Sequence, residues 1–66
     1  MKILLNGRVR DVRAGASLSE LVRDLGLRPE LVAIEVNGEL VPRSSHASRE
    51  LRAGDAVELV TLVGGG

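Results

Sequence analysis

Two Asn-Gly dipeptides, at positions 6–7 and 37–38, impose the strongest constraint on the fold of this 66-residue chain. Both central residues of a type I′ turn need a positive φ, which Asn and Gly tolerate better than other residues. Apolar and β-branched residues flank each dipeptide, and this pattern is typical of a β-hairpin. The sequence therefore predicts two hairpins, with strands at Lys2–Leu5, Arg8–Val12, Val32–Val36 and Glu39–Val41.

One amphipathic helix is predicted between the hairpins. Ser17 and Glu20 have the spacing of a capping box, in which each side chain accepts a hydrogen bond from the other residue's backbone. Apolar residues then recur on one helical face, at Leu18, Leu21, Val22 and Leu25. Gly26 can take the left-handed conformation that ends a helix, so we expect a helix from about Leu18 to Leu25.

The longest apolar run, Ala56–Val63, predicts a central strand that is covered on at least part of both faces. Pro42 cannot donate a ladder hydrogen bond and limits the fourth strand to an edge. The polar stretch 43–50 is expected to cross over as a loop with a helical turn. This order predicts an α+β fold of the ubiquitin-like β-grasp type, with a mixed sheet of about five strands and one main helix on one face. We expect a β-grasp domain over residues 1–63 and a flexible glycine tail over residues 64–66.

The composition argues against several classes of function. Nine basic residues balance nine acidic ones and there is no aromatic residue, so we expect neither a nucleic-acid partner nor a membrane partner. The absence of cysteine excludes thiolate chemistry and cysteine-ligated zinc, and favours a cytoplasmic protein over a disulfide-stapled secreted one. A single histidine, His46, is expected to be a surface or crossover residue, so no metal site is predicted.

The chain resembles the sulfur carrier proteins of bacterial thiamine biosynthesis, the ThiS family, over essentially its whole length. The segments that carry the resemblance are Ile3–Gly7, the capped helix, Val36–Arg43, Leu51–Asp55 and Val57–Gly66. The Asn-Gly hairpin that leads into Val-Pro-Arg points to this family rather than to β-grasp proteins in general. The chain departs from the family near His46, where the crossover often carries a large aromatic side chain.

The resemblance implies that the chain is acted on by partner enzymes and has no catalytic residue or bound cofactor of its own. An E1-like adenylyltransferase would use ATP and magnesium to adenylate the carboxylate of Gly66. A sulfur donor, such as a cysteine desulfurase, would then convert the adenylate into a thiocarboxylate. A thiazole synthase would receive that sulfur to form the thiazole ring.

The tail residues suit presentation to such enzymes. Val63, Gly64 and Gly65 would carry Gly66 into a buried site, because glycine lacks a Cβ and can enter a narrow channel. Four extended residues span at most about 14 Å. Alternation along the last strand places Val60 and Leu62 on one face, and we expect them to form a partner-docking patch with Leu4 unless they are ordinary buried residues.

Other functions remain open from the sequence. The same tail chemistry would serve sulfur transfer to molybdopterin or transfer RNA, or attachment to proteins as a ubiquitin-like modifier. A different class is a β-grasp interaction module whose tail has no chemistry.

Overall fold

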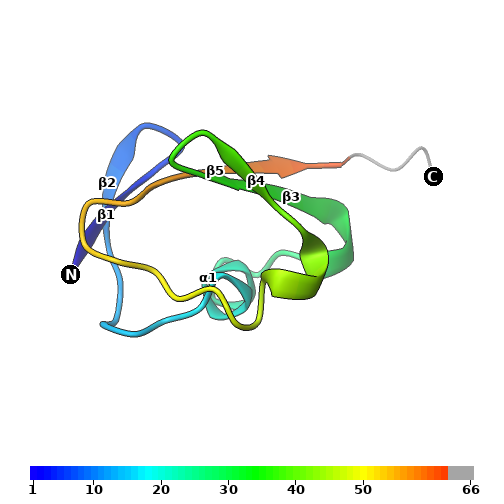
Figure 1. The fold of residues 1–66 in the computed structure, drawn as a ribbon, viewed down its shortest axis with the longest axis horizontal. Coiled ribbons are helices and arrows are strands. Elements are labelled where there is room, and N and C mark those ends of the chain that lie inside the picture. Colours follow the sequence, from blue (N-terminus) through cyan, green and yellow to red (C-terminus); the bar gives the residue numbers. More distant parts are fainter. Residues whose placement is uncertain (63–66) are drawn as a thin grey trace.

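The computed structural model describes residues 1–62 as one sheet with a helix and a crossover segment on one of its faces (Figure 1). The predictions for Val63, Gly64, Gly65 and Gly66 lie outside the described residues. The elements, in chain order, are β1 (Lys2–Leu5), β2 (Arg8–Asp11), α1 (Leu18–Asp24), the 3₁₀ helix η1 (Pro29–Leu31), β3 (Val32–Val36), β4 (Glu39–Val41), the 3₁₀ helix η2 (Arg43–Ser45) and β5 (Ala56–Thr61).

The strand order is β2-β1-β5-β3-β4, and the ladder between β1 and β5 is parallel while the others are antiparallel. Both Asn-Gly turns have the positive φ values that the hairpins require, at Asn6 (50°) and Asn37 (53°) and at the glycine that follows each of them. The predicted mixed five-stranded β-grasp sheet is confirmed. The last strand is central and lies beside the first, and β4, which precedes Pro42, is an edge strand as predicted.

Helix α1 begins with the predicted capping box. The backbone amide of Glu20 donates to Ser17 Oγ at 3.1 Å, and the amide of Ser17 donates to Glu20 Oε1 at 3.3 Å. Leu18, Leu21 and Val22 are buried on the face that meets the sheet. They pack against the strand residues whose side chains point to the helix side of the sheet. These include Ile3, Val32, Ile34, Val36 and Val57.

Several boundaries differ from the sequence-based ones. Strand β2 ends at Asp11 and α1 at Asp24, one residue earlier than expected in each case, and Leu25 is the helix C-cap. Strand β5 ends at Thr61. The helical turn η2 within the crossover is confirmed, whereas η1 was not predicted.

The expectation that the last strand is covered on at least part of both faces is wrong. Val57 is buried towards the helix, but Glu58 and Val60 on the other face are exposed. A single short helix covers only one face of a sheet, and nothing else in residues 1–62 lies over the other face (Figure 1). We call this uncovered side the open face.

Candidate functional site

The candidate site begins where β5 ends, because this strand leads into the glycine tail. The backbone amide of Leu62 donates to the carbonyl of Leu31 at 2.6 Å, which continues the pairing of β5 with β3 one residue beyond the strand. Strand β5 runs away from the N-terminus of the chain (Figure 1). The described part of the chain therefore sets where β5 ends and the direction in which it runs.

Asn6 holds β5 on the side of β1. The last register pair between β1 and β5 is Leu5 with Val57, so β5 would otherwise have a free edge beyond that point. The side chain of Asn6 replaces the missing strand, because its Oδ1 accepts from the backbone amide of Leu59 at 2.8 Å and its Nδ2 donates to the carbonyl of Leu59 at 3.3 Å. A turn residue thereby extends the ladder towards the tail.

Asn37 holds the start of β5 in a similar way. Its Oδ1 accepts from the amide of Ala56 at 2.9 Å and its Nδ2 donates to Asp55 Oδ1 at 3.1 Å. Asp55 is buried and also accepts from the amide of Arg52 at 2.8 Å, with the guanidinium of Arg49 at 3.7 Å. Asn37 therefore holds the start of β5 in addition to forming the turn, and Asp55 connects Asn37 to the crossover.

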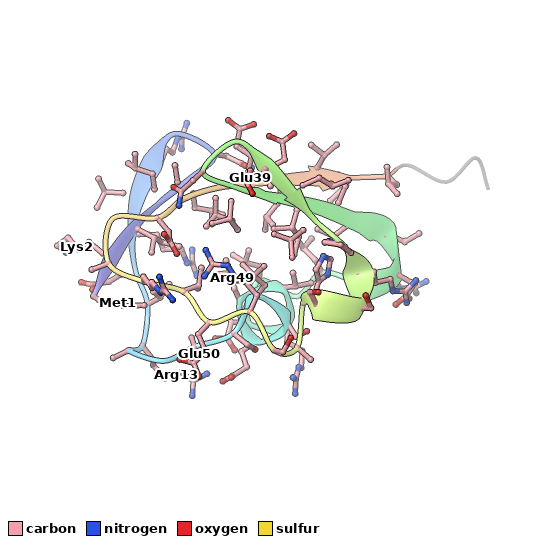
Figure 2. All side chains as sticks on the ribbon, viewed as in Figure 1. Met1, Lys2, Arg13, Glu39, Arg49 and Glu50 are labelled. Carbon is pink, nitrogen blue, oxygen red and sulfur yellow. The ribbon has the colours of Figure 1, made fainter. Side chains whose placement is uncertain are left out.

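Arg49 contributes the charged contact to Asp55. Its side chain is about one-third exposed and pairs with Asp55, and it donates to the carbonyl of Glu50. Figure 2 shows Arg49 between the crossover and the sheet. An ion pair thus ties the crossover to Asp55, the residue before β5, and a single sequence does not reveal this contact.

The three predicted patch residues are all exposed on the open face. The exposed fractions are 40% for Leu4, 57% for Val60 and 53% for Leu62, which excludes burial in the core. They do not form one continuous surface, however. The register places Leu4 beside Ala56, so Glu58 lies between Leu4 and Val60 along the sheet.

Additional apolar side chains on the open face were not predicted. Leu40 is 70% exposed and lies across from Glu35, while Val9 is 66% exposed and lies across from Leu4. An apolar hollow next to Leu62 is lined mainly by Ala33, Leu40, Val41 and Pro42. A second hollow, on the helix side of Leu62, is lined by Leu27, Leu31 and Thr61 among others. The alternation of β4 could have identified Leu40, because it shares a face with Glu35 and not with the core.

His46 is buried, with only 5% of its surface exposed, although it was expected to be a surface or crossover residue. It does lie in the crossover, and its Nε2 lies 3.0 Å from the carbonyl oxygen of Val41. Since a carbonyl only accepts, Nε2 is the protonated nitrogen in this contact. The imidazole therefore fills the place between the crossover and β4 and satisfies the last carbonyl of that edge strand.

Two carboxylates have a lowered pKa, and both are structural. Hydrogen bonding to Lys2, at 2.9 Å, and then to the N-terminal ammonium lowers the pKa of Asp11. The pKa of Glu20 is lowered chiefly by the hydrogen bond from the backbone of Ser17 and also by Arg13 at 2.6 Å. Figure 2 places Met1, Lys2 and Arg13, which are the partners of these two carboxylates, away from the C-terminal end of β5. Asp11 and Glu20 therefore take no part in the candidate site.

Within residues 1–62 there is no group of three or more histidine, aspartate or glutamate side chains that could hold a metal ion. In the same range, no helix has the length and apolar character needed to cross a membrane.

The model of the ThiS family matches residues 3–66. The chain belongs to the ThiS family. It is 32% identical to the sulfur carrier protein ThiS of Escherichia coli, with all of both chains covered. The crystal structure of the thiamine biosynthesis protein ThiS from Geobacter metallireducens superimposes with a TM-score of 0.85 at 32% identity, again over the full length of both chains. The predicted family and β-grasp fold are confirmed, and these relatives support a sulfur carrier in thiamine biosynthesis.

A thiazole synthase from Paramagnetospirillum magneticum also matches all of this ThiS family chain, at 39% identity. The chain spans about a fifth of the length of the thiazole synthases it matches. Those thiazole synthases therefore contain a ThiS-like segment within a longer protein, which links this type of domain to thiazole synthesis.

Proposed function

We propose that this ThiS family chain is a sulfur carrier whose Gly66 carboxylate is activated and converted to a thiocarboxylate for thiazole formation in thiamine biosynthesis. The observation that carries the proposal is the family match over residues 3–66, which includes all three tail glycines. The chain is then a protein co-substrate that acts in the cytoplasm, and its partners carry out the catalysis.

The chemistry needs activation because a carboxylate is a poor electrophile. An E1-like adenylyltransferase would bind ATP and magnesium, and the Gly66 carboxylate would attack the α-phosphate and displace pyrophosphate. The terminal sulfur of a persulfide, supplied by a sulfur donor such as a cysteine desulfurase, would then displace AMP and form an acyl disulfide. A thiol reductant would cleave the S–S bond of that acyl disulfide, which leaves the thiocarboxylate on Gly66 and a disulfide on the donor side. Splitting one difficult substitution into two easier ones is the usual benefit of a covalent intermediate. A thiazole synthase would take the sulfur from the thiocarboxylate.

The described residues support this role through placement rather than through catalysis. Strand β5 is central, and Asn6 and Asn37 hold it from neighbouring turns, so the partner meets the tail at a defined position. Val63, Gly64 and Gly65 would then thread Gly66 into the partner's active site. We propose that Val60 and Leu62 provide the main apolar contact to the activating enzyme, with Leu4 as a separate contact on the same open face.

Intact-protein mass spectrometry tests the proposal. The chain is incubated with ATP, magnesium, an E1-like adenylyltransferase that accepts a ThiS family carrier, and a sulfide source. The mass should rise by about 16 Da, the difference between one sulfur and one oxygen atom, which is the change that covalent conversion of a carboxylate requires. A variant that lacks Gly66 should keep the fold and show no mass change. An unchanged wild-type mass, under conditions in which the Escherichia coli sulfur carrier is modified, would refute the role.

A further inference from the structure

The most unusual feature of the open face is a pair of acidic residues at its centre. Glu35 in β3 and Glu58 in β5 are directly opposite each other in the antiparallel ladder, and both are exposed. Side chains in such pairs have Cβ atoms about 5 Å apart, and like charges in this arrangement are destabilising. Within residues 1–62 the structure gives neither carboxylate an ion-pair partner.

The remaining charges on the strands of this face compensate each other. Lys2 and Asp11 are also paired across strands and form an ion pair at 2.9 Å. Arg8 and Arg10 lie opposite Leu5 and Ile3, so they belong to the other face of the sheet. The two central glutamates therefore give the open face of the sheet its local negative charge.

Apolar side chains flank the two glutamates on both sides along the strands. Leu4 and Val9 lie towards the N-terminal end of the sheet, and Val60 and Leu62 lie towards the tail, with Leu40 across from Glu35. Among residues 1–62, five of the six exposed large aliphatic residues belong to this face or its end. Interfaces combine apolar anchors with charges of opposite sign, and such charges set the partner and the association rate.

We propose that the open face docks a protein partner that inserts a lysine or arginine side chain between Glu35 and Glu58, while its aliphatic side chains cover the apolar residues on either side. The occupant is the E1-like activating enzyme, because that enzyme must hold the carrier while Gly66 is adenylated. This inference rests on the proposed function. It adds that the surface of the activating enzyme that faces Glu35 and Glu58 carries a positive charge. A cation from the partner would remove the repulsion that the free carrier bears.

This role has a signature that a purely structural role lacks. Glu35→Gln and Glu58→Gln should each make the free chain more stable, with Tm rising by about 2–4 °C, because the like-charge contact is lost. The same substitutions should weaken binding to the activating enzyme by about tenfold, and the salt dependence of binding should become shallower. A structural role would move stability and binding in the same direction.

The experiment compares the wild type, E35Q, E58Q and a control variant. For each protein, adenylation by the E1-like enzyme is measured at several salt concentrations, and Tm is measured for the free chain. Glu50→Gln is the matched control, since Glu50 is exposed in the crossover, on the helix side of the molecule (Figure 2). The control should bind as the wild type does. Wild-type adenylation with unchanged KM in E35Q and E58Q would overturn this inference alone. Absence of wild-type adenylation would overturn the proposed function and this inference with it.

Discussion

The side-chain amide of Asn6 makes two hydrogen bonds to the backbone of Leu59, a residue 53 positions later in the chain. Strand β1 is too short to pair with β5 along its full length, because the register ends at Leu5 and Val57. The side chain of Asn6 supplies the hydrogen bonds that a longer β1 would provide. The turn therefore has two functions. It reverses the chain with a positive φ, and it supports the strand that leads to the glycine tail.

Replacing Asn6 separates these two functions. Asn6→Gly keeps the positive φ but removes both bonds, so the free energy of unfolding should fall by about 1–2 kcal/mol. Denaturant titration measures this loss, and hydrogen exchange should show faster opening at the Leu59 amide. Asn6→Asp keeps the acceptor for that amide and should lose about half as much. Equal stability of the glycine variant and the wild type would show that the two bonds contribute nothing.

His46 is predicted to stabilise the crossover without taking part in sulfur transfer. His46→Ala removes a buried side chain and leaves the Val41 carbonyl without its partner. The free energy of unfolding should therefore fall by about 2–4 kcal/mol. Thermal unfolding measures the change, and Ser44→Ala, at an exposed position in the same segment, serves as the control. Thiocarboxylate formation at a temperature where the variant is folded should be unchanged. A lost mass shift in folded His46→Ala would contradict a purely structural role.

The lowered pKa of Glu20 predicts a specific acid sensitivity. Because its folded-state pKa lies below the ordinary value of 4.5, the unfolded chain binds the proton more readily. The stabilisation is therefore complete above that value and is lost as the pH falls through the folded-state pKa. Glu20→Gln keeps the capping geometry but does not titrate, so its unfolding free energy should depend less on pH below about 4.5.

Salt distinguishes the two causes at Glu20. High salt screens the exposed pair with Arg13, whereas the hydrogen bond from the Ser17 backbone persists. Chemical denaturation at pH 2–6, with and without 1 M salt, measures the unfolding free energy of the wild type and of Glu20→Gln. Most of the difference in pH dependence between the two proteins should remain at high salt. Identical pH profiles for the two proteins would contradict the prediction.

The apolar contact near the tail is tested by charge insertion at exposed positions. Val60→Asp and Leu62→Asp should each reduce kcat/KM for adenylation by about tenfold or more, because a carboxylate would be desolvated at the interface. Val60→Thr keeps the β-branched shape and should have a small effect. Ala47→Asp, in the exposed part of the crossover, should match the wild type. Unchanged kinetics in both aspartate variants, with the fold verified by circular dichroism, would remove these residues from the interface.

The local parts of the fold could be predicted because they depend on neighbours in the sequence. The type I′ turns at Asn6 and Asn37 follow from backbone sterics, and the start of α1 follows from the reciprocal bonds of Ser17 and Glu20. The apolar run that starts at Ala56 predicted a central last strand, and Pro42 predicted that the fourth strand lies at an edge. The candidate site at Gly66 also came from the sequence, through its resemblance to the ThiS family.

The tertiary structure decided how distant side chains are used. His46 is buried because β4 and the crossover meet around it. Asp55 joins Asn37 and Arg49 because the β3–β4 turn and the connection from η2 to β5 meet there. The register between β3 and β5 sets Glu35 against Glu58 and separates Leu4 from Val60. Hydrogen bonds and charge contacts act over a few ångströms, so residues remote in sequence acquire these roles only when folding brings them together. The sequence determined the local elements and the family resemblance on which the proposed tail chemistry rests, and the packing determined the surface around the end of β5.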